Sequence, residues 1–204
     1  MTPTFEDSRL NSIREKVERY ERLTPEDGLT LYRTPDLLGV GWLANQVRER
    51  QNGNSTFFNV NRHINPTDVC VASCKLCAFG KKARDPKAYT MSLDEIWHRA
   101  GEGYREAITE FHIVGGLHPT LTLDWYCEML RGLKQRYPQV HLKAFTMVEL
   151  IEIQRQAGKP LPEVLIDLKS AGLDSLPGGG IEILSDRVHE ELFDRKLDGD
   201  GWMD

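Results

Sequence analysis

The sequence predicts an α/β protein, an incomplete barrel of parallel strands that is preceded by a helical segment. Beyond residue 56, short apolar runs typical of β-strands alternate with helical patterns, and this alternation predicts a parallel sheet. A closed barrel of eight strands takes about 250 residues, whereas roughly four strands can be counted in this chain of 204 residues. We therefore expect a helical segment over residues 1–56 and, over residues 57–204, a barrel that lacks its C-terminal strands.

Three helices are expected in the N-terminal segment. Residues 8–22 place apolar side chains three or four positions apart, the pattern of an amphipathic helix, at Leu10, Ile13, Val17 and Tyr20. Thr24, followed by Pro25 and two acidic residues, predicts the N-cap and first turn of a second, short helix. Residues 36–50 are predicted to form the third.

Strands and helices alternate in the remainder of the chain. The expected strands are residues 56–64, 110–114, 140–145 and 173–176, and the expected helices are residues 92–104, 121–136, 148–157 and 162–171. In a parallel sheet the ligand sites lie at the carboxyl ends of the strands. A distinctive motif follows each strand here: the cysteines, Gly115-Gly116, Thr146 and a glycine run after Pro177. We expect these four motifs to share one pocket.

Side-chain alternation along the strands predicts a polar interior. If the apolar positions face the outer helices, these outward residues are Phe58, Val60, Ile64, Phe111, Ile113, Val140, Leu142 and Ala144. The inward residues are then Asn59, Asn61, His63, His112, His141 and Lys143. A packed barrel fills its centre with branched apolar side chains, so this interior is interpreted as a site for a large polar ligand. A register shift of one residue would invert every assignment.

The overall composition argues against several classes of protein. A net charge of −5 without a basic stripe does not suit a nucleic-acid partner, because binding phosphates requires clustered Lys and Arg. No run approaches the roughly 18 apolar residues of a transmembrane helix, and the N-terminus is too charged for a signal peptide. We therefore expect a cytoplasmic protein that binds neither nucleic acid nor membrane.

Three cysteines, Cys70, Cys74 and Cys77, lie at the spacing Cys-x3-Cys-x2-Cys. A cluster of four irons takes one protein ligand per iron, so three thiolates would leave the fourth iron open to an outside ligand. The remaining cysteine, Cys127, lies in an apolar helical stripe and is expected to be a core residue. The spacing therefore favours an iron–sulfur cluster with a reactive corner.

Zinc is the alternative metal for this triplet. A Cys3His site closed by His63 or His112 would have spacings that zinc tolerates. Structural zinc usually pairs two Cys-x-x-Cys sequences, and a second one is missing from the sequence. Disulfides are disfavoured too, since cysteines clustered so unevenly would crosslink little of the chain.

Four segments of the sequence carry a resemblance to a known family. They are NVNRHINPTDVCVASCKLCAFG (59–80), TEFHIVGGLHP (109–119), HLKAFTMVEL (141–150) and GLDSLPGGGIEIL (172–184). The first resembles the cluster-binding segment of radical S-adenosylmethionine (SAM) enzymes, and together they are most similar to the aminofutalosine synthase family. The similarity runs from about Leu23 to the last residue. Because that family continues well beyond this point, the chain is expected to be an amino-terminal fragment of a radical SAM barrel.

This resemblance implies a 4Fe–4S cluster on Cys70, Cys74 and Cys77, with SAM bound to the open iron. The other residues that we expect to bind SAM are Phe79 near the adenine, Gly115 and Gly116 near the methionine ammonium, and Pro177, Gly178 and Glu182 after the fourth strand. Glu182 would accept from the ribose hydroxyls, although it is also a candidate for an acid at the start of a surface helix. Leu117 stands where many members of the family have Glu, so the methionine contact would depend more on the main chain.

The resemblance also implies a reaction. The 5'-deoxyadenosyl group of SAM would add to 3-[(1-carboxyvinyl)oxy]benzoate, and rearrangement with decarboxylation would give aminodeoxyfutalosine for menaquinone biosynthesis. Burying the two substrate carboxylates demands cations or several hydrogen-bond donors. The expected substrate-binding residues are Lys143, then His63, Arg62, Thr146 and Asn61, with ordinary surface charges as the alternative for Arg62 and Lys143. The expected partner is a one-electron reductant such as flavodoxin or ferredoxin.

Other functions stay open from the sequence alone. One is a sister radical SAM activity, either dehypoxanthine futalosine cyclase or a subunit of FO (deazaflavin) synthase. Another is a non-catalytic zinc-binding domain. An open half barrel exposes a sheet edge, so we expect the 204-residue chain by itself to have little or no turnover.

Overall fold

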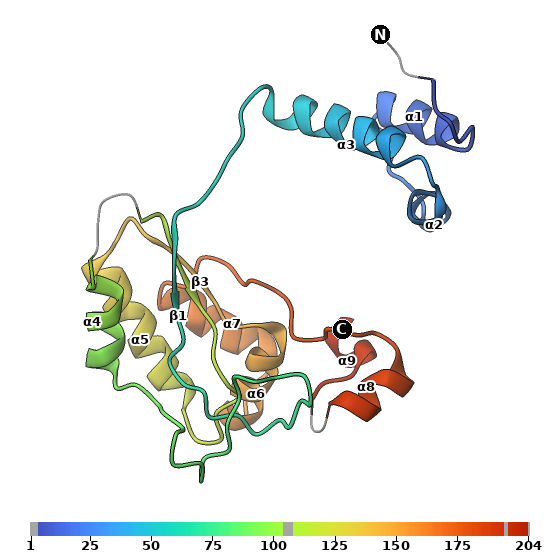
Figure 1. Cartoon of the computed structure of the whole chain (residues 1–204). Helices are drawn as coiled ribbons and strands as arrows, with labels where there is room; N and C mark the ends of the chain where they lie inside the picture. Colours follow the sequence, from blue (N-terminus) through green and yellow to red (C-terminus); the bar gives the residue numbers. More distant parts are fainter. Residues whose placement is uncertain (1–3, 104–107, 194–195, 204) are drawn as a thin grey trace. The chain divides into compact units, whose positions relative to one another are not determined.

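The computed structural model describes residues 4–103, 108–193 and 196–203 (Figure 1). Within it the chain divides into two units, Met1–Phe58 and Asn59–Asp204. Each unit has a hydrophobic core of its own.

The first unit consists of helices α1 (Leu10–Glu18), α2 (Pro25–Arg33) and α3 (Leu37–Asn52). Helix α2 starts as predicted, because the Thr24 side chain accepts from the backbone N–H of Asp27 and the Asp27 side chain accepts from that of Thr24. Three predicted apolar positions of α1 are buried beside Phe5 and Leu43, namely Leu10, Ile13 and Val17. The prediction for Tyr20 was wrong: this residue lies beyond the helix with a positive φ and is exposed.

The second unit contains a parallel three-stranded sheet in the order β1-β2-β3. The strands are β1 (Asn61–Ile64), β2 (Glu110–Ile113) and β3 (His141–Ala144). The helices are α4 (Leu93–Gly101), α5 (Leu123–Arg136), α6 (Met147–Ala157), α7 (Leu161–Ser170), α8 (Asp186–Leu192) and α9 (Gly199–Met203). The predicted α/β class and the alternation of strand and helix are confirmed.

The boundaries of β2 and β3 differ from the prediction by one residue, and those of the other two expected strands differ by more. The first strand begins at Asn61, five residues later than expected. The fourth expected strand is reduced to a single parallel bridge, Lys143 with Ser175, although the Ser175 carbonyl also accepts from the Ala144 N–H at 3.1 Å. The predicted helix over residues 92–104 ends at Gly101, and Tyr104 lies outside the described residues.

The two faces of the sheet differ in polarity, as the alternation predicts. One face is buried under α4, α5, α6 and α7, and its fully covered residues are Ile64, Phe111, Ile113, Leu142 and Ala144. The opposite face carries Asn61, His63, Glu110, His112, His141 and Lys143. The prediction that Phe58 and Val60 face outer helices was wrong, because the chain enters the sheet only at Asn61 and both side chains are exposed.

No described helix is long and apolar enough to cross a lipid bilayer.

Candidate functional site

The three cysteines lie on the loop that connects β1 to α4. Their thiols are free; Cys70 and Cys74 are half-buried, and Cys77 is exposed. The Gly80 N–H approaches the Cys77 sulfur at 3.3 Å. Burial raises the pKa of the Cys74 thiol, and the positive charge of Lys196 opposes this effect.

A buried carboxylate, Asp68, organises this loop. It accepts from the Tyr89 N–H at 2.7 Å and forms an ion pair with the Lys81 ammonium. Burial acts to raise the pKa of Asp68, but the hydrogen bonds from Lys81 and Tyr89 prevail and hold it below its ordinary value. The Lys81 backbone continues the link, since its carbonyl accepts from the Cys70 N–H at 2.8 Å. Our sequence reasoning missed Asp68, although an Asp after Asn-Pro-Thr is a common turn signal.

The loop after β2 packs directly against the cysteine loop. The Gly116 N–H donates to the Thr67 carbonyl at 2.9 Å, and the Val71 N–H donates to the Leu117 carbonyl at 2.9 Å. A Cβ atom on Gly116 would lie only 2.2 Å from the Val69 carbonyl oxygen. Gly116 is therefore explained by the close approach of two backbones.

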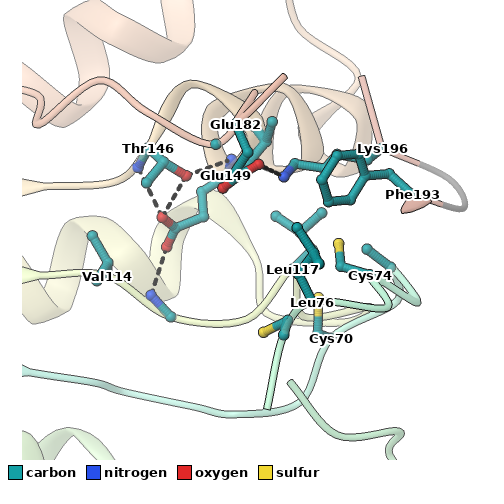
Figure 2. Close-up of a pocket in the computed structure, with 15 residues that line it drawn as sticks. Cys70, Cys74, Leu76, Val114, Leu117, Thr146, Glu149, Glu182, Phe193 and Lys196 are labelled. Carbon is teal, nitrogen blue, oxygen red and sulfur yellow. Dashed lines mark hydrogen bonds and ion pairs between the residues drawn. The ribbon is translucent and has the colours of Figure 1, made fainter. Parts of the chain in front are cut away.

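A cavity of about 410 Å³ opens where these loops meet (Figure 2). Its wall includes all three cysteines, and the other loops contribute Gly115 after β2, Thr146 after β3 and Gly180 from the glycine run. The expectation that the four motifs share one pocket is thus confirmed. The cavity lies at the carboxyl ends of the parallel strands, where ligands bind in such sheets.

Glu149 is a buried acid in the cavity wall that sequence reasoning did not single out. Its Oε2 accepts from the Thr146 N–H and hydroxyl, both at 2.8 Å, and its Oε1 accepts from the Gly115 N–H at 2.9 Å. Burial raises the pKa of Glu149 to about 7, against the lowering effect of these hydrogen bonds. The signal was present as Thr146-Met-Val-Glu149, a capping box at the start of α6.

Two further charges line the cavity and pair with each other. The Lys196 ammonium forms an ion pair with the Glu182 carboxylate and lies 4.3 Å from the centre of the Phe193 ring (Figure 2). The Lys196 side chain is almost completely buried. This pair therefore adds no net charge to the cavity wall.

A second polar group lies on the uncovered face of the sheet. Lys143 Nζ is 2.9 Å from Oε2 of Glu110, a buried acid that sequence reasoning also missed. The His63 and His112 rings meet edge to face with their centres 5.1 Å apart. Among the described residues, the other Glu110 oxygen, Oε1, finds no hydrogen-bond donor. Burial acts to raise the pKa of Glu110, but the Lys143 ammonium, together with the nearby Asn59 and Asn61 amides, outweighs it and the pKa is lowered.

The structure brings together some of the predicted site residues and separates others. The cysteines, Gly115, Thr146 and Glu182 line the cavity, whereas Phe79, Gly116, Pro177 and Gly178 are not among its described lining residues. Asn61, His63 and Lys143 share the uncovered face. Arg62 points to the other face, where its guanidinium donates to the carbonyls of Arg99 and Ala100 in the last turn of α4.

The donor set at the cavity suits a multinuclear cluster. In the part of the chain that the structure describes, no group of three or more His, Cys, Asp or Glu side chains could hold a single metal ion. A cluster does not require such convergence, because each thiolate binds a different iron. The three free thiols on one cavity wall are therefore compatible with a 4Fe–4S cluster.

Comparisons with known proteins identify relatives for this arrangement. The profile of the Radical SAM superfamily matches residues 64–204. The aminodeoxyfutalosine synthase of Streptomyces coelicolor is 44% identical over 190 residues, which cover 93% of this chain and 49% of that protein. The enzyme of the same name from Thermus thermophilus is 39% identical over 198 residues, covering 97% and 53% of the two chains.

A third relative has a different name. The 5-amino-6-(D-ribitylamino)uracil–L-tyrosine 4-hydroxyphenyl transferase of Methanopyrus kandleri is 40% identical over 159 residues, covering 78% of this chain and 43% of that protein. The chain spans about half the length of the curated relatives that it matches.

Solved structures show the same fold at low sequence identity. A maturase of the FeFe-hydrogenase has a TM-score of 0.60 at 13% identity, covering 89% of this chain and 48% of that one. A methylornithine synthase has a TM-score of 0.57 at 16% identity, covering 88% and 62%. These likenesses extend to the fold alone.

Proposed function

Because the chain belongs to the radical SAM superfamily, whose members use a 4Fe–4S cluster and SAM, we propose that it is the cluster- and SAM-binding part of an aminodeoxyfutalosine synthase. One observation carries this proposal: three free thiols line one cavity at the carboxyl ends of a parallel sheet. The identity of 44% to an aminodeoxyfutalosine synthase over 93% of the chain supports the choice of reaction.

In this proposal Cys70, Cys74 and Cys77 hold three irons of the cluster. When bound, the reduced cluster supplies the electron that cleaves SAM at its sulfonium. The chain's own part is to hold the thiols in place. Asp68 does so through Lys81, and Gly116 does so because the absence of a Cβ atom lets the loop after β2 pack directly against the cysteine loop. An external one-electron reductant, such as flavodoxin or ferredoxin, would complete the system.

SAM would occupy the cavity of about 410 Å³ beside the thiols. Gly115 presents backbone from the loop after β2, and Glu182 offers a carboxylate to the ribose hydroxyls. Gly180 lines the cavity and has a positive φ, so we assign the close backbone approach of the glycine run to this residue. Phe79, Pro177 and Gly178 lie off the lining, so their roles would be indirect.

The substrate in this proposal is 3-[(1-carboxyvinyl)oxy]benzoate, which receives the 5'-deoxyadenosyl group of SAM. Its carboxylates need donors, and the uncovered sheet face offers Asn61, His63 and Lys143. Lys143 is paired with Glu110 at 2.9 Å. A substrate carboxylate would therefore share the ammonium with Glu110 instead of meeting a free cation.

Anaerobic reconstitution with iron and sulfide tests the cluster proposal. We expect a broad brown absorbance that bleaches with dithionite, and a paramagnetic signal of the reduced chain that SAM perturbs. Replacing Cys70, Cys74 or Cys77 with Ala should abolish the absorbance. The matched control is Cys127→Ala, because Cys127 is buried in α5 and should leave iron content unchanged. A colourless chain that retains zinc would refute the proposal.

The choice of reaction is tested by offering alternative substrates to the reconstituted chain. Because the chain alone is expected to have little or no turnover, the assay uses stoichiometric amounts of chain and dithionite, and mass spectrometry should find at most a trace of the adenosylated product, and only with 3-[(1-carboxyvinyl)oxy]benzoate. The transferase named above, at 40% identity, is the second candidate. Release of 5'-deoxyadenosine with tyrosine and 5-amino-6-(D-ribitylamino)uracil, but not with the benzoate, would favour it.

A further inference from the structure

The cavity beside the cysteines contains one acidic group that no cation neutralises. Glu182 is paired with Lys196, but no described Lys, Arg or His lies within ion-pair distance of the Glu149 carboxylate. Glu149 is nonetheless buried, with 8% of its surface exposed. A buried carboxylate without a counter-charge is costly, so the cavity as a whole favours a ligand that brings a positive charge.

The hydrogen bonds of Glu149 leave one acceptor position open. A carboxylate has about four acceptor sites. Two donors from Thr146 fill Oε2, and the Gly115 N–H occupies one site on Oε1. The open acceptor site is therefore on Oε1, the oxygen that also accepts from the Gly115 N–H. It can be filled by a ligand group that carries both a positive charge and an N–H bond.

Building on the proposed function, we propose that the Glu149 carboxylate accepts a hydrogen bond from the α-ammonium group of SAM and so positions the methionine end of the molecule. SAM carries two positive groups, but the sulfonium has no hydrogen to donate. Only the ammonium can satisfy both the charge and the open acceptor site. In Figure 2, Glu149 lies on the same cavity as Cys70 and Cys74, which come from a different loop.

The protonation of Glu149 provides a second, independent signature. With a pKa raised to about 7 by burial, the carboxyl is partly protonated at neutral pH before ligand binds. A bound ammonium favours the charged form and lowers this pKa. Binding near pH 7 should therefore release protons, and affinity should increase as the pH rises through the pKa of the free carboxyl.

Two stable analogues isolate the ammonium contact. S-adenosylhomocysteine keeps the amino acid end but lacks the sulfonium, and 5'-methylthioadenosine lacks both. Binding of SAM and of each analogue is measured by calorimetry to the 204-residue chain, reconstituted with iron and sulfide and kept oxidised, at two pH values and in two buffers of different ionisation enthalpy. The variant is Glu149→Gln, which can retain part of the capping box. The control is Glu152→Gln on the same helix, whose carboxylate is held by Arg155 outside the cavity lining.

We expect Glu149→Gln to lower the affinity for S-adenosylhomocysteine at least about tenfold, the usual effect of losing a hydrogen bond between charged groups. Affinity for 5'-methylthioadenosine should not change, and the proton release on binding S-adenosylhomocysteine should disappear. Glu152→Gln should behave as wild type.

Three results would overturn the assignment. Equal losses for both analogues would mean that Glu149 only supports the loops. Unchanged affinity for S-adenosylhomocysteine with reduced affinity for SAM would mean that the sulfonium is its partner, and unchanged affinity for both would remove it from the site. In each case an intact, SAM-sensitive cluster would leave the proposed function standing. A chain that assembles no cluster, or that binds neither analogue, would contradict the proposed function as well.

Discussion

Gly116→Ala tests whether the cysteine loop depends on close backbone packing. The added Cβ atom would lie 2.2 Å from the Val69 carbonyl oxygen and 3.1 Å from the Cys70 Cβ atom. Ordinary contacts begin near 3.4 Å, so the cysteine loop must retreat by about 1 Å, and a forced backbone shift of this kind costs about 1–3 kcal/mol. The expected loss in melting temperature is about 2–12 °C for a chain of this size.

The assay combines thermal unfolding with iron content after reconstitution. Because the displaced segment carries the first cysteine, iron per chain should fall together with stability. Gly41→Ala in α3 is the matched control, since nothing lies within 4 Å of its added Cβ atom. That substitution should stabilise the helix by about 0.5–1 kcal/mol. Wild-type melting and full iron content in Gly116→Ala would refute the packing argument.

Three further predictions concern polar groups near the site. Asp68→Ala should lower the free energy of unfolding, measured with denaturant, by about 1–3 kcal/mol, because it leaves the Tyr89 N–H without its hydrogen-bond acceptor. Because burial is outweighed by hydrogen bonds that lower the folded pKa of Asp68, its contribution should be complete above about pH 4 and should decline as the pH falls through the lower, folded pKa. A stability difference from Asp68→Ala that stays constant over the whole acid range would contradict this. Glu110→Gln should lower the free energy of unfolding by about 1–3 kcal/mol in the wild type, and by less in a chain that already carries Lys143→Met. Additive losses in this double-mutant cycle would mean that the ion pair contributes nothing to stability. Thr146→Ala removes the N-cap of α6 and should lower the free energy of unfolding by about 1 kcal/mol; it should also weaken the binding of S-adenosylhomocysteine. Thr122→Ala, which removes the N-cap of α5, should lower stability as much without affecting binding. Equal affinity of the two variants for S-adenosylhomocysteine would count against the link to Glu149.

Local patterns predicted the parts of the fold that depend on neighbouring residues. The cap at Thr24 and the break between α6 and α7 at Gly158 could be predicted because their signals lie within one helical turn. The cysteine spacing and the order of motifs after the strands likewise predicted one shared cavity. Period-two alternation predicted which face of the sheet is buried from Ile64 onward, where three strands support the pattern.

The same reasoning failed where the chain leaves regular structure. Phe58 and Val60 continue the alternation of the first strand, yet they precede the sheet and remain exposed. The fourth strand was predicted from its apolar residues, but only Ser175 forms a bridge to β3. A pattern specifies which residues could pair, and pairing itself requires a partner strand at that register.

The sequence by itself determined the family, the α/β class and the three thiols, because each of these is encoded in contiguous residues. Only the tertiary structure decided which charges are engaged. The sequence shows Lys143 only as a cation, whereas in the fold it is paired with Glu110. The sequence likewise shows Glu149 only as a helix-capping residue, whereas in the fold it accepts from the Gly115 N–H, 34 positions away, and lines the cavity. Desolvation and charge pairing depend on distance in space, and the sheet register brings together groups that the linear order keeps apart.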